Sequence, residues 1–137
     1  MQRLARGAPS ARTLRRYARA AAAAGLHVTL RVVGAAEARR LNRAFRNRDY
    51  ATNVLSFSYG RDRGDIVLCQ PVIAREAREQ GKTLHAHYAH MVVHGLLHLR
   101  GLDHARRADA ARMERREIRI LRGLGFPDPY RLKAAVK

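Results

Sequence analysis

Three histidines near the middle of the second half of the chain have the spacing of ligands to one metal ion. His94 and His98 are four residues apart, and His104 follows Gly101. On a helix, residues four apart project from one face, so both imidazoles can bind the same ion. Glycine accepts the backbone angles that break a helix sharply, and such a turn can bring His104 back to that ion. The spacing therefore predicts a metal site formed by His94, His98 and His104.

Three neutral imidazoles suit zinc and leave a fourth coordination position open. Catalytic zinc sites have such an open position, where water binds and its pKa falls to about 7. A structural zinc site usually closes with four protein ligands and often uses cysteine, but Cys69 is the single cysteine and lies far from the histidines in sequence. We therefore expect one Zn²⁺ per chain in a hydrolytic site. Taken one at a time, each histidine would be interpreted as a hydrogen-bonded core residue.

The histidine spacing also matches H-E-x-x-H-x-x-G-x-x-H, the ligand pattern of metzincin proteases. In those enzymes a glutamate after the first histidine acts as the general base. Gly95 occupies that position here and has no side chain. A protease of that mechanism is disfavoured, and any other peptidase-like zinc hydrolase would need a carboxylate from elsewhere in the chain, such as Asp65 or Glu114.

Eight helices and strands are expected to position these residues. Apolar periodicity, the N-cap Ser10 and glycine stops predict helices over residues 11–24, 35–45, 71–80, 84–100 and 109–121, and strands over residues 27–33, 53–59 and 65–69. The helix over 84–100 is strongly apolar and should be central and buried. Apolar residues of two other helices should pack in the core: Ala38, Leu41 and Phe45 in the second helix, and Met113, Ile118 and Leu121 in the last.

Charge and hydropathy limit the class of partner. The formal net charge is +17, which attracts polyanions such as RNA. An arginine- and alanine-rich composition on solvated helix faces explains the charge equally well, and charge alone does not decide between them. No apolar run approaches the roughly 20 residues of a membrane helix, and the first ten residues lack the apolar region of a secretory signal. We expect a cytoplasmic protein without a membrane partner.

Several short motifs, in a fixed order, resemble those of the YbeY family, bacterial metal-dependent endoribonucleases of ribosomal RNA maturation and ribosome quality control. The resemblance spans most of the chain. Its motifs are Leu41-Asn42, Phe45-Arg46, Asp49, Thr52-Asn53-Val54-Leu55-Ser56-Phe57, Gly64-Asp65-Ile66 and the histidine motif itself. Two features depart from the family pattern: Ala51 replaces a common proline, and the loop over residues 60–63 is short.

The resemblance implies a fold, a site and partners. The fold would be α+β, a single domain over residues 1–137 with a small mixed sheet of three to four strands flanked by about five helices. Family members usually begin with a strand, so residues 1–5 are expected to be the remnant of a truncated one. Zinc would be bound by His94, His98 and His104. The partners would be ribosomal RNA and the ribosome or its proteins, and we expect a monomer.

The resemblance also implies that Arg46 is a catalytic residue. A guanidinium can donate two hydrogen bonds to a phosphate and stabilise its developing charge. From the residues alone, an ordinary surface salt bridge would be the favoured interpretation of Arg46. Asp103 could orient a ligand histidine or cap a turn, and both interpretations stay open. His85, His87 and His90 are expected to be structural or exposed rather than ligands.

The favoured hypothesis is a zinc-dependent, single-strand-specific endoribonuclease acting in ribosomal RNA processing, at the 3′ end of the 16S RNA, and in ribosome quality control. The first alternative is a non-catalytic ribosome-assembly factor that binds RNA and uses zinc only to stabilise its fold. The second is the peptidase-like zinc hydrolase. Metal-dependent RNA cleavage distinguishes the first hypothesis from the other two.

Overall fold

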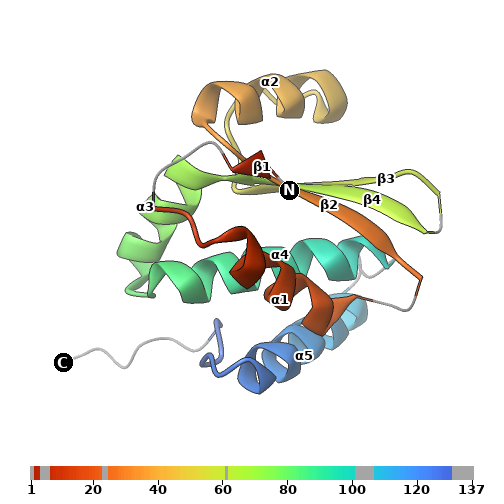
Figure 1. Ribbon diagram of the computed structural model, residues 1–137, viewed down its shortest axis with the longest axis vertical. Helices are drawn as coiled ribbons and strands as arrows, with labels where there is room; N and C mark the ends of the chain where they lie inside the picture. Colours follow the sequence, from red (N-terminus) through yellow and green to blue (C-terminus); the bar gives the residue numbers. More distant parts are fainter. Residues whose placement is uncertain (1, 4–6, 23–24, 61, 101–106, 131–137) are drawn as a thin grey trace.

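The structure of the chain is a computed structural model that describes residues 2–3, 7–22, 25–60, 62–100 and 107–130 (Figure 1). Its centre is a four-stranded sheet with the strand order β1-β2-β4-β3. The strands are β1 (Gln2–Arg3), β2 (His27–Val33), β3 (Val54–Ser58) and β4 (Arg63–Cys69). Neighbouring strands are parallel except for the antiparallel pair of β3 and β4, so the sheet is mixed, as predicted, and β3 forms one edge.

The helices of the described chain lie on both faces of this sheet. They are α1 (Ala11–Ala21), α2 (Ala35–Arg46), α3 (Gln70–Gln80), α4 (Leu84–Leu99) and α5 (Arg107–Gly123). Figure 1 shows α2 on one face and α1, α4 and α5 on the other, with α4 nearest the strands. The predicted α+β class, with its small mixed sheet and about five helices, is confirmed.

Local chemistry sets most helix ends where the sequence predicts them. The hydroxyl of Ser10 accepts a hydrogen bond from the backbone N–H of Thr13 at 3.2 Å and begins α1. Gly81 ends α3 at a φ of 65°, in the left-handed region that glycine adopts without strain. The predicted extent of the first helix is wrong, because α1 ends at Ala21 and Ala22 already has extended backbone angles.

The helix α4 forms the centre of the larger hydrophobic core, as predicted. Val92, Leu96 and Leu97 are fully buried and belong to the same core cluster as Ile66 on the sheet. Gly95 lies on the side of this helix that packs against the sheet. A Cβ atom at this position would lie 3.1 Å from the Ile66 Cδ1 atom and 3.1 Å from the Ser56 hydroxyl. The absence of a side chain at Gly95 therefore lets α4 pack directly against β3.

Two predicted core positions are wrong. Phe45 is 65% exposed, because it lies in the last turn of α2 and packs only edge-on against Phe57, which is itself half-buried. Ile118 is only half-buried and lies beside arginines of α5, whereas Met113, Glu117 and Leu121 are buried. The buried stripe of α5 thus has a spacing of four residues and includes a carboxylate.

No helix in the described part of the chain combines the length and the apolar character needed to cross a membrane.

Candidate metal centre

A cavity of about 630 Å³ lies between the edge strand β3 and the last turn of α4. Three of the four predicted site residues, Arg46, His94 and His98, line it together. The remaining cavity residues are Val54, Leu55, Ser56, Ser58 and Leu99. His104, the fourth predicted residue, lies outside the described residues, as do Gly101 and Asp103.

The rings of His94 and His98 lie next to each other on the α4 wall of this cavity. Their Nε2 atoms are 3.1 Å apart and their ring centroids 4.6 Å apart. Both residues lie in the last turns of α4, four positions apart, so the helix places them on one face as the spacing predicts. The structure therefore brings the first two predicted ligands together.

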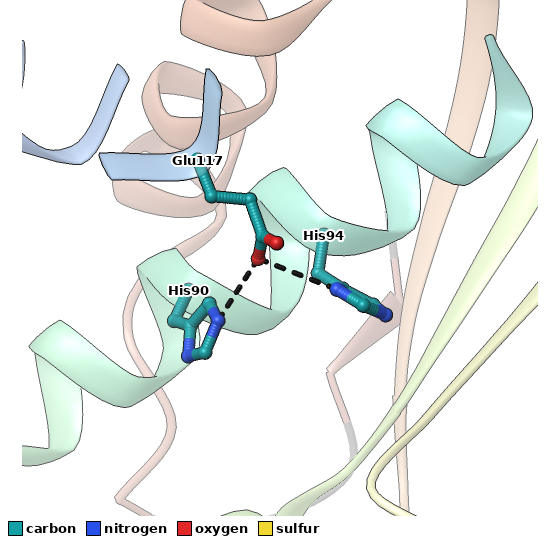
Figure 2. Close-up of side chains that lie close together, drawn as sticks. All are labelled: His90, His94 and Glu117. Atoms are coloured by element: carbon teal, nitrogen blue, oxygen red, sulfur yellow. Dashed lines mark hydrogen bonds and ion pairs between the residues drawn. The ribbon is translucent and has the colours of Figure 1, made fainter. Parts of the chain in front are cut away.

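Glu117, from the neighbouring helix α5, contacts the opposite side of the His94 ring. This carboxylate is fully buried, and its Oε2 atom lies 3.3 Å from Nδ1 of His94 and 2.9 Å from Nε2 of His90 (Figure 2). The hydroxyl of Tyr130 donates to the other oxygen, Oε1, at 2.8 Å. Sequence reasoning missed Glu117, although a glutamate on the buried stripe between Met113 and Leu121 was the available signal.

The protonation of this cluster follows from burial and hydrogen bonding. Burial alone would raise the pKa of Glu117, but the hydrogen bonds and charges of His90 and His94 outweigh it and lower the pKa to about 2. Burial lowers the pKa of His90 by more than Glu117 raises it, so His90 is neutral at pH 7. An ionised carboxylate only accepts hydrogen bonds, so Nδ1 of His94 must donate to Glu117.

This hydrogen bond sets the tautomer of His94 and leaves a lone pair on Nε2, directed at Nε2 of His98. In Figure 2 the second ring nitrogen of His94 points away from Glu117. Without an ion, Nε2 of His98 can donate a hydrogen bond to this lone pair at 3.1 Å; with a cation between them, both nitrogens can act as ligands. Ligand nitrogens on tetrahedral zinc, with Zn–N bonds of about 2.0–2.1 Å, are roughly 3.3 Å apart. The separation and the donor chemistry of His94 and His98 therefore fit a shared metal ion.

A second group of donors in the described chain could also hold a metal ion. One atom from each of His90, His94 and Glu117 lies within 4.8 Å of the other two. His94 belongs to both groups, but through different nitrogens: Nδ1 faces Glu117 and Nε2 faces His98.

Arg46 reaches the cavity from the opposite side of the sheet. Its Nη2 atom donates to the backbone carbonyl of Ser56 at 2.5 Å, at the edge of β3, and its guanidinium lies 5.4 Å from the centre of the Phe57 ring. The side chain is exposed. The charge of Arg46 is thus held beside the cavity and stays accessible to an anion.

The other candidates lie elsewhere. Asp65 accepts a hydrogen bond from the Tyr59 hydroxyl, and neither Asp65 nor Glu114 is among the residues that line the cavity. His85 is exposed and shares a hydrogen bond with Tyr17, and His87 is paired with Glu76. His85 and His87 are therefore exposed and structural, as expected, whereas His90 contacts Glu117.

The fold and the cavity define a class: an α+β protein whose central helix presents histidines to a pocket at the sheet edge, as in a metalloenzyme. A sequence profile described as "Endoribonuclease YbeY" matches residues 10–125. The chain belongs to this endoribonuclease family. This confirms the predicted family and the enzyme class that its name gives, a hydrolase of the endonuclease type.

Relatives with the same description are closely similar to the chain. It is 54% identical over 125 residues to "Endoribonuclease YbeY" of Aromatoleum aromaticum, covering 89% of this chain and 81% of that protein. It is 61% identical over 108 residues to the protein of the same name from Bordetella petrii, covering 75% of this chain and 70% of that one. The match to the protein from an Azoarcus species covers 90% of this chain but only 53% of the longer relative.

A solved structure has the same fold. The solution structure of a Thermotoga maritima protein superposes with a TM-score of 0.59 and covers 96% of this chain and 99% of its own, at 23% sequence identity. At this identity the likeness supports the fold and nothing further.

Proposed function

We propose that this protein is a zinc-dependent endoribonuclease that cuts single-stranded ribosomal RNA. One observation carries the proposal: the facing Nε2 atoms of His94 and His98, 3.1 Å apart, lie on the wall of the cavity that Arg46 also lines. Membership of the endoribonuclease YbeY family supports the same reaction.

We assign the zinc ion to His94, His98 and His104, with Glu117 as the partner that orients His94. Two features favour this set over His90, His94 and Glu117. The distances of 2.9 and 3.3 Å within the second group are those of hydrogen bonds that already satisfy the carboxylate. Glu117 is also fully buried, whereas Nε2 of His94 faces a cavity that can admit a substrate.

Zinc bound there would lower the pKa of water and polarise a phosphodiester. The protein's own residues would position the substrate. Arg46 would exchange its hydrogen bond to the Ser56 carbonyl for a phosphate oxygen, because an anion is the stronger acceptor. Glu117 would keep the Nδ1 proton on His94 and so keep Nε2 available to the metal.

The proposed partners are ribosomal RNA and the ribosome or its proteins, met in the cytoplasm by a monomer. The formal charge of +17 supports a polyanionic partner, since neutralising phosphates releases their counterions. We place the activity at the 3′ end of the 16S RNA and in ribosome quality control because the sequence resembles the YbeY family. The non-catalytic assembly factor and the peptidase-like hydrolase are alternative outcomes of the test below.

The test is cleavage of an end-labelled ribosomal RNA fragment by the full chain, stripped of metal with a chelator and then reloaded with zinc. Cleavage should require zinc and should be lost in His98→Ala and Arg46→Ala. Matched controls are His85→Ala, on the exposed start of α4, and Arg43→Ala, one turn before Arg46 in α2. Both controls should cut at the wild-type rate.

Three outcomes contradict the proposal. RNA binding without cleavage, at every zinc concentration, indicates the assembly factor. Peptide cleavage without RNA cleavage indicates the peptidase-like hydrolase. Equal cleavage by His98→Ala and the His85→Ala control removes His98 from the site.

A further inference from the structure

The sheet face that carries α2 is covered at one end only. In Figure 1 the β3–β4 hairpin extends past α2, and no helix of the described residues lies over its outer end on that side. Aromatic side chains gather at this uncovered end: Phe45 is 65% exposed, Tyr59 is 59% exposed and Phe57 is half-buried. Exposed aromatic rings on one open sheet face call for an explanation, because large apolar groups rarely remain in water together without a partner.

This open face and the metal cavity lie on opposite sides of the strand β3. Side chains alternate along a strand, so Phe57 and Tyr59 point to the α2 face while Ser56 and Ser58 point to the cavity on the α4 face. Arg46 touches both sides: it lines the cavity and its guanidinium lies 5.4 Å from the centre of the Phe57 ring. A flexible ligand bound in the cavity can therefore continue around the strand edge onto the aromatic face.

The aromatic rings are held in place before any ligand binds. Phe45 packs edge-on against Phe57, with ring centroids 5.4 Å apart and an interplanar angle of 69°. The Tyr59 hydroxyl donates to Oδ2 of Asp65 at 2.9 Å, which fixes this ring against the sheet. Stacking on such rings costs little additional side-chain entropy.

The charge on this face suits a phosphate backbone. Arg46 and Arg63 are exposed: the guanidinium of Arg46 lies by the Phe57 ring, and Arg63 lies opposite Tyr59 on β4. Two of the acidic groups nearby are engaged, since Asp65 accepts from Tyr59 and Glu37 is paired with Arg31, and Asp62 is exposed at the hairpin turn. With a formal charge of +17 on the whole chain, an acidic polymer is favoured over a protein of ordinary composition.

We propose that Phe45, Phe57 and Tyr59 form a base-stacking platform for single-stranded RNA next to the cut phosphodiester. The inference rests on the proposed function, because it supplies that site with its substrate-holding surface. Unpaired bases would stack on the rings, the backbone would pass Arg46 at the edge of β3, and the scissile phosphate would lie in the cavity. A base-paired strand has no free base faces to stack, so the platform selects single strands.

The experiment measures binding separately from cleavage. The full chain is stripped of metal, and its affinity for a fluorescent single-stranded RNA of about ten nucleotides is measured by anisotropy. Phe45→Ala and Tyr59→Ala are expected to weaken binding by at least about fivefold each, the lower end of base stacking on an aromatic ring. Both side chains are exposed, and unchanged thermal unfolding would show that the variants fold.

Two matched substitutions and one matched ligand isolate stacking. Tyr59→Phe keeps the ring but loses the hydrogen bond to Asp65 that fixes it, so it should bind more tightly than Tyr59→Ala and less tightly than the wild type. Phe45→Leu keeps apolar bulk without a ring and should bind as weakly as Phe45→Ala. An oligonucleotide with the same phosphates but abasic positions should bind wild type and variants equally.

Equal affinity of wild type, Phe45→Ala and Tyr59→Ala for the RNA overturns the platform and leaves this face as a surface for a protein partner. The result is independent of the cleavage test. Cleavage by the wild type with unchanged variant affinities means that the platform is wrong and the proposed function stands. Weakened binding in the variants without any wild-type cleavage means that the platform stands and the proposed function fails.

Discussion

Two of the histidine–carboxylate pairs of the helix α4 resemble each other in their contact distance but differ in the surroundings of the second ring nitrogen. Nε2 of His87 lies 2.8 Å from Oε1 of Glu76, and Nδ1 of His94 lies 3.3 Å from Oε2 of Glu117. The second nitrogen of His87 is buried and has no hydrogen-bond partner among the described residues. The second nitrogen of His94 faces His98 at the cavity.

The two pairs differ in the surroundings of the second ring nitrogen, which is enclosed in His87 and lies at the cavity in His94. Glu76 also accepts from the side chain of Asn53, at the entrance to β3, so the His87 pair ties α3, α4 and the sheet together. Glu117 instead fixes the tautomer of a ring that opens onto a cavity. A histidine–carboxylate pair therefore indicates a site only where the other nitrogen is accessible.

The largest effect should come from the same substitution made in each pair. His94→Leu should lower zinc-dependent RNA cleavage by more than about 100-fold, because a metal ion supplies several kcal/mol of charge stabilisation. His87→Leu should leave the rate unchanged and lower the free energy of unfolding by about 1–3 kcal/mol, because Glu76 loses a partner. Cleavage rates and urea unfolding measure the two effects. Equal loss of cleavage in both variants would break the comparison.

Substitution of the two carboxylates should produce a smaller difference, which is measured as zinc affinity. Glu117→Gln should reduce zinc affinity by about 10–100-fold, because the amide no longer orients His94 as a carboxylate does. Glu76→Gln is the matched control and should bind zinc as the wild type does. Competition with a chromophoric chelator measures both affinities. If Glu117→Gln also bound zinc as the wild type does, the His94–Glu117 pair would be structural, like the His87–Glu76 pair.

A third prediction concerns the close packing of α4 against the sheet at Gly95. Gly95→Ala should lower the free energy of unfolding by about 1–3 kcal/mol, the usual cost of overpacking. Its new Cβ would lie 3.1 Å from both Ile66 and Ser56. Gly123→Ala in α5 is the control, because nothing lies within 4 Å of its Cβ position. Chemical denaturation measures both, and equal stability of Gly95→Ala and wild type would rule out the close packing.

The smallest expected effect is a pH dependence of the free energy of unfolding that comes from the His87–Glu76 pair. Burial lowers the pKa of His87 below its ordinary value of 6.5, against the smaller upward effect of Glu76, while Lys82 and His90 add to the lowering. Below pH 6.5 the unfolded chain therefore binds a proton that the folded chain does not, and stability falls as pH falls. This contribution has a slope of at most about 1.4 kcal/mol per pH unit.

Because His87→Leu removes this group, the stability gap between wild type and variant should narrow as the pH falls below 6.5. Urea unfolding at a series of pH values checks the trend. If the stability gap widened as the pH fell, His87 would be protonated in the folded protein and stabilised by the Glu76 carboxylate.

The elements and the meeting of His94 and His98 were predictable because their signals are local. Ser10 and Gly81 mark helix ends through their own backbone chemistry, and His94 and His98 share a face through helix periodicity alone. Residues four apart on one helix meet regardless of how the rest of the chain folds.

The residues that sequence reasoning misplaced depend on contacts between elements. Glu117 was passed over for Ile118 because an apolar stripe normally excludes carboxylates, and only the packing of α5 against His90 and His94 explains its burial. Phe45 has the periodicity of a core residue, but whether α2 covers the sheet at that point is not encoded within the helix. Arg46 reaches the cavity across β3, and family resemblance rather than spacing pointed to it.

The hydrogen bond from Arg46 to the Ser56 carbonyl also bears on self-association. In the ladder of β3 with β4, Asn53 and Tyr59 form backbone hydrogen bonds to the partner strand, so the alternating residues Val54, Ser56 and Ser58 direct their backbone groups outward. An open strand edge invites a second chain to add a strand. Arg46 occupies the middle carbonyl of that edge and places a positive charge beside it, and both features disfavour the addition of a further strand there.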